Sequence, residues 1–229
     1  MKTQSDSPPY SRFFADALFS GFLLMCGLVL GAGSAHAATQ SYSGLFSLDD
    51  ERALMSFTVA TPGAVTMQTW SFGGGIDGAG NAVAAGGFAP VLSLFDATDA
   101  LIGVAQAGVA GCGDGNVDSS SGYCWDVSWS GVLGAGSYLA VLTQDDNSPT
   151  GPFLSDGFLR DGQGNFTGPN FLGVAGSFIL VDGAQRDGHW ALDVTTPIPE
   201  PEPWAVLLAG LGLIGLRTLP GSNRARLTD

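Results

Sequence analysis

Positively charged residues are scarce in this sequence. The chain of 229 residues has eight Lys and Arg residues against 21 Asp and Glu residues, which gives a formal net charge of −13. Residues 38–197 contain no lysine, and their only basic residues are Arg52, Arg160 and Arg186. Binding to nucleic acid and docking on anionic lipid both depend on basic surface. The sequence therefore predicts no nucleic-acid partner.

Histidine and the common catalytic motifs are missing as well. His189 is the only histidine after residue 37, and the sequence has no C-x-x-C, G-x-S-x-G or H-E-x-x-H pattern. Zinc sites and serine-nucleophile sites are built from such patterns. We therefore predict that the protein is not an enzyme. These patterns indicate no cofactor with certainty.

Cysteine is rare, and its placement is informative. Of the three cysteines, Cys26 lies in the N-terminal apolar segment, so removal of that segment would leave only Cys112 and Cys124. An even pair in an exported protein is typical of a disulfide bond. The sequence predicts a Cys112–Cys124 disulfide, and the alternative is a pair of buried free thiols.

The N-terminus has the layout of a secretory signal peptide. Lys2 and Arg12 precede the apolar stretch 13–33, and small residues at Ala35 and Ala37 follow it. A basic start, an apolar centre and an A-x-A end are the features that signal peptidase requires. Residues 1–37 are therefore predicted to be a signal-peptide helix, cut after Ala37. The alternative is an uncleaved membrane anchor.

The C-terminus mirrors this arrangement. Prolines alternate through residues 197–203, an apolar stretch covers 204–216, and arginines follow it. Thirteen apolar residues are short for a stable span, so a short transmembrane helix is predicted. Under the positive-inside rule its arginines stay in the cytoplasm. Both ends of the chain thus predict that residues 38–196 lie outside the inner membrane.

Residues 197–229 resemble the PEP-CTERM sorting signal. The resemblance is carried by Pro199, Glu200 and Pro201, then Trp204, the Gly- and Leu-rich stretch and the arginines. It implies processing by an exosortase in a Gram-negative bacterium that makes exopolysaccharide. It also implies a final position at the cell surface or in the extracellular matrix. The alternative is a plain tail anchor on a proline-rich stalk.

Short stretches of alternating apolar and polar residues run through residues 38–196, and no helical stripe persists there. Such alternation is typical of half-buried strands. Strands are predicted at 53–59, 65–68, 90–95, 101–105, 124–132, 138–143, 178–181 and 190–194. We therefore predict an all-β domain, a single β-sandwich of jelly-roll or Greek-key type, between the two terminal helices.

Two families resemble this domain. In the bacterial pre-peptidase C-terminal domain, acidic residues also precede a strand, and segments 91–96 and 136–142 are similar to its later strands. The DVUA-type family of exported proteins of unknown function is similar over nearly the whole domain. Its matching stretches are 45–50, 136–144, 154–158, 164–167 and 188–193. Both resemblances imply a sandwich, and neither implies an activity.

Oxygen-bearing side chains gather in three loops, which suggests calcium. This ion takes about six to eight oxygen ligands, and weak sites are common in extracellular modules. The candidate ligands are Asp114, Asn116 and Asp118 in one loop, Asp145 and Asp146 in another, and Asp49 and Asp50 in the third. The first loop resembles part of an EF-hand but lacks its glycine and glutamate. The alternative for each loop is an Asp-rich turn.

Aromatic side chains suggest a second ligand, a carbohydrate. Tyr123 and Phe153 fall in predicted turns, where an exposed ring could stack on a sugar of an exopolysaccharide. A purely structural role in the matrix, without either ligand, is the third hypothesis. We favour an exported, non-enzymatic binding or structural protein, with calcium and exopolysaccharide left as open candidates.

Overall fold

The computed structural model describes residues 37–108, 111–199, 207–208 and 210–211. The predictions on Ala35, Glu200, Pro201 and Trp204, and on most of both terminal segments, lie outside these residues. Within the described ranges, no helix is long and apolar enough to cross a membrane.

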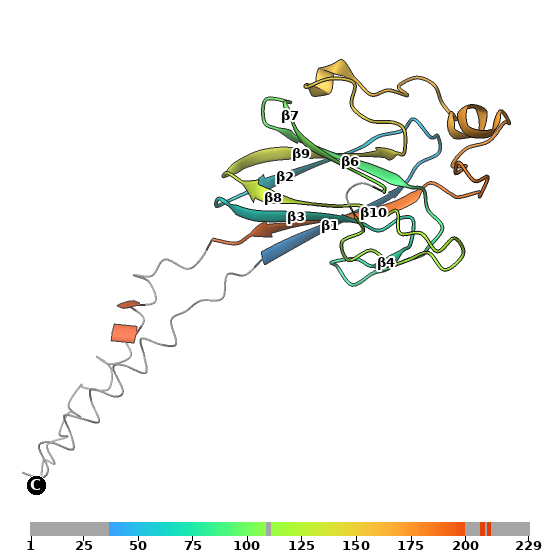
Figure 1. The fold of residues 1–229 in the computed structure, drawn as a ribbon. Helices are drawn as coiled ribbons and strands as arrows, with labels where there is room; N and C mark the ends of the chain where they lie inside the picture. The colour runs from blue at the N-terminus through green and yellow to red at the C-terminus, as the bar shows by residue number, and fades with distance from the viewer. Residues whose placement is uncertain (1–36, 109–110, 200–206, 209, 212–229) are drawn as a thin grey trace, which may run out of the picture. The chain divides into compact units, whose positions relative to one another are not determined.

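The predicted all-β fold is confirmed: two four-stranded antiparallel sheets form the core architecture of the described chain (Figure 1). One sheet has the order β1 (Ala37–Leu45), β10 (His189–Pro197), β3 (Gly63–Thr69), β8 (Ser128–Leu133). The other has the order β2 (Ala53–Val59), β9 (Gly136–Gln144), β6 (Pro90–Asp96), β7 (Leu101–Gln106). A two-stranded sheet of β4 (Gly75–Ile76) and β5 (Ala82–Val83) and two short helical turns, Leu154–Asp156 and Gly168–Leu172, lie in the connections.

The two sheets form a β-sandwich because they bury their inner faces against each other. Alternate residues of β2, β3, β9 and β10 belong to one apolar cluster, whose strand members include Met55, Phe57, Val65, Met67, Leu142, Leu192 and Val194. Since successive residues of a strand point to opposite faces, the residues between these members face outward. A stacked pair of rings, Phe46 and Phe88, adds to the same cluster.

Three details differ from the predicted strands. The segment 178–181 is not a strand, because Phe178 has a positive φ of 49° and its N–H bonds to the carboxylate of Asp49 rather than to a ladder. Strand β8 begins at Ser128 rather than at 124, since the N–H of Val127 bonds to the Thr69 hydroxyl rather than to a strand carbonyl. Strand β1 was not predicted, because this edge strand is mostly exposed and lacks an apolar alternation.

The first and last strands of the domain are neighbours. Strand β1 pairs with β10 along its whole length, from Ala37 opposite Pro197 to Leu45 opposite His189. This pairing brings the two ends of the chain segment 37–197 together. It also places polar residues from both ends on one outer sheet face.

Candidate functional site

The outer face of the sheet β1-β10-β3-β8 carries two rows of polar side chains that run across the strands. The first row consists of Ser41, Asp193, Gln68 and Ser128, and the second of Thr39, Thr195, Thr66 and Ser130. These positions alternate with the core residues of the same strands, which fixes their outward direction. The face therefore offers hydroxyl, amide and carboxylate groups at neighbouring positions.

Part of this face is hollowed into a pocket of about 330 Å³, called here the polar pocket. Its floor is made by residues of the two rows, namely Thr39, Thr66, Gln68, Asp193 and Thr195. Its two walls come from separate connections. The first wall follows β3 and consists of Trp70, Ile76 and Gly78, and the second wall is Asp114. The volume lies at the small end of the range for ligand sites, about 300–1,000 Å³. The pocket therefore suits a small polar molecule or one end of a chain.

Asp193 fastens the first wall to the floor. Its carboxylate accepts hydrogen bonds from the Trp70 indole at 2.6 Å, from the Gly78 N–H at 2.7 Å and from the Ser41 hydroxyl at 2.5 Å. Asp193 is only 7% exposed, so water could not easily replace its carboxylate as the acceptor for these donors. Gly78 has to be a glycine here, because a Cβ would collide with the methyl group of Thr39.

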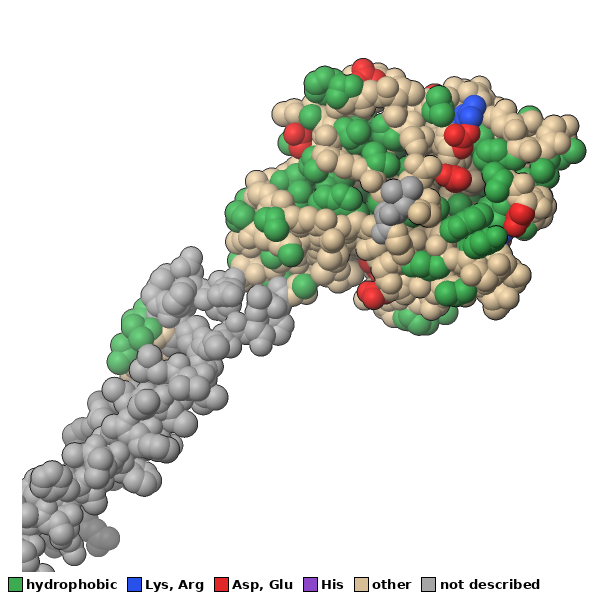
Figure 2. All heavy atoms as spheres, viewed as in Figure 1, with side chains coloured by type: hydrophobic (Ala, Val, Ile, Leu, Met, Phe, Trp, Pro, Cys, Tyr) green, Lys and Arg blue, Asp and Glu red, His purple; other side chains and the backbone are tan. Residues whose placement is uncertain are grey.

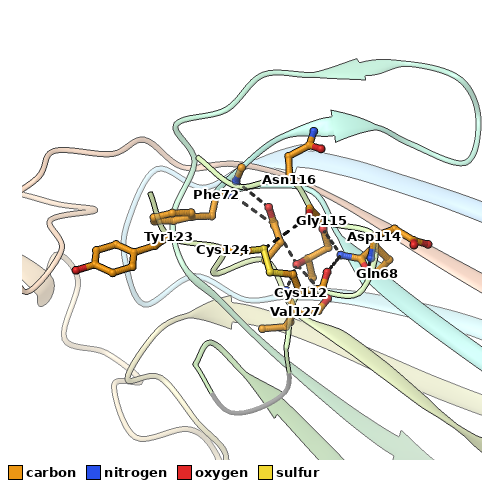
Figure 3. The surroundings of a disulfide bond; sticks show 12 residues. Gln68, Phe72, Cys112, Asp114, Gly115, Asn116, Tyr123, Cys124 and Val127 are labelled. Atoms are coloured by element: carbon orange, nitrogen blue, oxygen red, sulfur yellow. Dashed lines mark hydrogen bonds between the residues drawn. A yellow bond between two sulfur atoms is a disulfide. The ribbon is translucent and has the colours of Figure 1, made fainter. Parts of the chain in front are cut away.

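Gln68 holds the second wall. Its amide nitrogen donates to the carbonyl of Cys112 at 3.0 Å, and its amide oxygen accepts the N–H of Asp114 at 3.0 Å. Figure 3 shows Gln68 and Asp114 on one side of the Cys112–Cys124 disulfide. The predicted pairing is confirmed, with Cα atoms 5.8 Å apart. One strand residue and one covalent bond thus place Asp114 at the pocket.

The pocket lacks positive charge. None of its lining residues is basic, and two are carboxylates, Asp114 and Asp193. The three arginines of residues 38–197 form ion pairs away from it, with Asp161, Asp146 and Asp118. Anionic ligands therefore find no positively charged partner in the pocket.

The three side chains of the loop proposed to resemble part of an EF-hand have different surroundings. The Asn116 amide donates to the carbonyl of Gly74 at 3.1 Å. The Asp118 carboxylate accepts the hydroxyls of Ser120 and Ser121 and an N–H of Arg186. Burial opposes ionisation of Asp118, but these hydrogen bonds and the charge of Arg186 lower its pKa to about 2. Asp114 faces the polar pocket instead.

The other predicted calcium ligands also have protein partners. Asp49 is fully buried and accepts hydrogen bonds from the backbone and hydroxyl of Thr167 and from the Phe178 N–H. Asp50 accepts the N–H of Gly164.

In the remaining loop, Asp145 accepts a bond from Gln106, and burial raises the pKa of this carboxyl. Its neighbour Asp146 pairs with Arg160. Among the described residues, no group of three or more His, Cys, Asp or Glu side chains could hold a metal ion. Calcium binding stays a prediction.

Asp126 is a structural carboxylate that no sequence pattern singles out. It is 1% exposed and accepts bonds from the N–H groups of Ser71, Phe72 and Gly73 and from the Thr69 hydroxyl. Burial raises its pKa, and the hydrogen bonds oppose that rise. This carboxylate organises the bend that follows Trp70, and so it supports the first wall of the pocket. A lone Asp between apolar residues gives no periodic signal.

The exposed aromatic side chains lie where the sequence predicts. Tyr123 and Phe153 are each 48% exposed. The Tyr123 ring stacks on Trp125, with centroids 4.8 Å apart, and lies on the opposite side of the disulfide from Asp114 (Figure 3). These two rings are not part of the polar pocket, whereas Trp70, which is 8% exposed, lines it.

His189 has a structural environment. One ring nitrogen contacts the carboxylate of Asp187 and the other the carbonyl of Ala84 at 2.8 Å. The second contact connects the start of β10 with the loop that contains Ala84. Figure 2 shows the acidic side chains of the visible face as separate small groups rather than one patch.

No protein-family model matches this chain, and no curated protein matches it.

Proposed function

We propose that this chain is an exported, non-enzymatic saccharide-binding protein of the bacterial cell surface or extracellular matrix. The observation that carries the binding function is the polar pocket, in which the hydroxyls of three threonines converge beside Trp70. Hydroxyl groups both donate and accept hydrogen bonds, which matches the hydroxyl groups of a sugar. An aromatic wall adds apolar contact to the carbon face of a sugar ring.

The export proposal is supported by the sequence at both ends. The signal peptide would be cut after Ala37, which is also the first residue of β1. The Pro-Glu-Pro motif of the sorting signal would begin at Pro199, two residues after β10 ends. Both processing regions thus border the sandwich without interrupting a core strand. We expect the mature protein to begin at Ala38, which N-terminal mass spectrometry of the exported product tests.

We assign the sandwich to the jelly-roll type. The assignment is supported by a chain that passes repeatedly between the sheets and by the first strand lying beside the last. In this proposal one jelly-roll sandwich lies in the chain between a signal-peptide helix and a short transmembrane helix.

A pair of matched substitutions tests the binding function. Thr66→Tyr would fill the floor of the pocket, whereas Thr58→Tyr makes the same change on the outer face of the other sheet. We expect titration calorimetry with short oligosaccharides to show binding to the unchanged chain and to Thr58→Tyr, and none to Thr66→Tyr. Equal binding by both variants would remove the pocket from the proposal. Absence of binding by the unchanged chain would favour a purely structural role in the matrix.

A further inference from the structure

We propose that the polar pocket selects saccharides that carry a protonated amine over neutral and acidic ones. The inference rests on the proposed saccharide-binding function and concerns the same pocket. It comes from the charges at the pocket and not from its hydroxyl groups, so the two proposals can fail separately.

Asp114 is the group that would meet the amine. Its side chain is exposed at the pocket wall, and within the described ranges its carboxylate accepts no hydrogen bond. Its backbone is nevertheless fixed, because the N–H bonds to Gln68 and the disulfide closes the loop beside it. A carboxylate that is held in place and has no partner is suited to an ammonium group, which donates up to about three hydrogen bonds.

Asp193 contributes charge without contributing a contact. Its two oxygens already accept bonds from Ser41, Trp70 and Gly78. It is buried at the floor, so its negative charge is less screened than a charge on the open surface. The floor and the wall of the pocket therefore carry charge of the same sign.

The net negative charge of the whole domain also favours a cationic ligand. Between residues 38 and 197 there are sixteen acidic and three basic residues, and each of these arginines is paired with a carboxylate. Such an imbalance creates a negative potential that attracts cations and repels anions at low salt. Uronic-acid polymers would be repelled before they reach the pocket. An amino sugar would be attracted over a distance and then paired with Asp114.

Three probes, each made of two sugar units, test this selectivity on the full-length chain. The probes are a glucosamine disaccharide, its N-acetylated form and a galacturonic acid disaccharide, each titrated by calorimetry at low and at physiological salt. We expect the amine form to bind roughly threefold to tenfold more tightly than the acetylated form, and the acidic form more weakly than both. The preference should shrink as salt rises.

Two isosteric substitutions locate the origin of the preference. Asp114→Asn should remove most of the preference for the amine probe and leave only the weaker effect of Asp193 and of the net charge, while binding of the acetylated probe stays unchanged. Asp99→Asn removes the same charge from an exposed turn outside the pocket and should keep the full preference. Equal losses of preference in the two variants, an undiminished preference in Asp114→Asn, or equal affinities for the unchanged chain would overturn this inference and leave the saccharide function standing. Failure of all three probes to bind overturns both proposals.

Discussion

The indole N–H of Trp70 donates a 2.6 Å hydrogen bond to the carboxylate of Asp193, although the two residues are 123 positions apart in the chain. This bond links the connection that follows β3 to the last strand of the sandwich. Since Asp193 also accepts bonds from Gly78 and Ser41, a single side chain connects the floor of the polar pocket with one of its walls.

Replacement of Asp193 tests this connection. Asp193→Ala would leave the buried donors of Trp70 and Gly78 without acceptors, so we expect the free energy of unfolding to fall by about 2–4 kcal/mol. Asp193→Asn keeps one acceptor oxygen and should cost less. Thr195→Ala, on the same strand and face, removes only an exposed hydroxyl contact with Thr39 and serves as the control. Urea unfolding of the three variants checks this order, which equal losses for Asp193→Ala and Thr195→Ala would contradict.

The contact between Gly78 and Thr39 predicts a rescue. Gly78→Ala should push the wall away from β1, because the new Cβ collides with the Thr39 methyl group, and we expect a loss of about 1–3 kcal/mol. Thr39→Ser removes that methyl group and keeps the hydroxyl. The double variant Gly78→Ala with Thr39→Ser should therefore be more stable than Gly78→Ala alone. Thermal unfolding measures both, and additive losses would show that the collision is not the cause.

The disulfide should matter for stability and for binding. Replacement of both Cys112 and Cys124 by serine frees a short loop, for which the chain-entropy model gives a loss of about 3 kcal/mol. Because this loop carries Asp114, we also expect weaker binding of the amine-bearing disaccharide. Calorimetry under oxidising and reducing conditions checks the second effect. The double serine variant is the control, since its binding should not respond to reductant.

Asp118 predicts a pH dependence of stability. Its pKa in the folded protein, about 2, lies below the ordinary value of 3.8 for an aspartate. The ionised form is therefore favoured by folding, and its contribution is present above the unfolded pKa and lost as the pH falls through the folded pKa. The stability difference between the unchanged chain and Asp118→Asn should be about 2 kcal/mol near pH 6 and should narrow between about pH 4 and pH 2. Denaturant unfolding across this range tests the sign, with Asp99→Asn as the control for net charge.

Calcium can be tested in the same way. The carboxylates of Asp49, Asp118 and Asp146 already have protein donors or an arginine beside them. The alternative of Asp-rich turns thus predicts that millimolar calcium changes the melting temperature by no more than about one degree relative to chelator. Ligand binding to the folded state raises stability in proportion to the logarithm of its concentration. A rise of several degrees would thus support a calcium site, and Asp114→Ala and Asp146→Ala would locate it.

Much of the architecture is readable from local patterns. The alternation at 53–59, 90–95 and 138–143 identifies β2, β6 and β9, because a half-buried strand imposes a period of two on its residues. The prediction of a strand at 178–181 is wrong, since the apolar residues 178–180 are buried in a loop that Asp49 holds. Strand β1 was not predicted for the opposite reason. This edge strand buries few side chains, so its sequence needs no alternation of apolar and polar residues.

The sequence by itself determined the all-β class, the acidic balance and the cysteine pair, because composition and short-range periodicity carry these properties. Which acidic residues are buried was decided only by the tertiary structure. Asp49, Asp126 and Asp193 look like any other Asp in a turn or strand, yet each accepts hydrogen bonds from distant parts of the chain. The polar pocket likewise exists only because β1 and β10, from opposite ends of the domain, pair beside β3. Pairing between distant strands leaves no local signal, so only the folded chain brings these residues together.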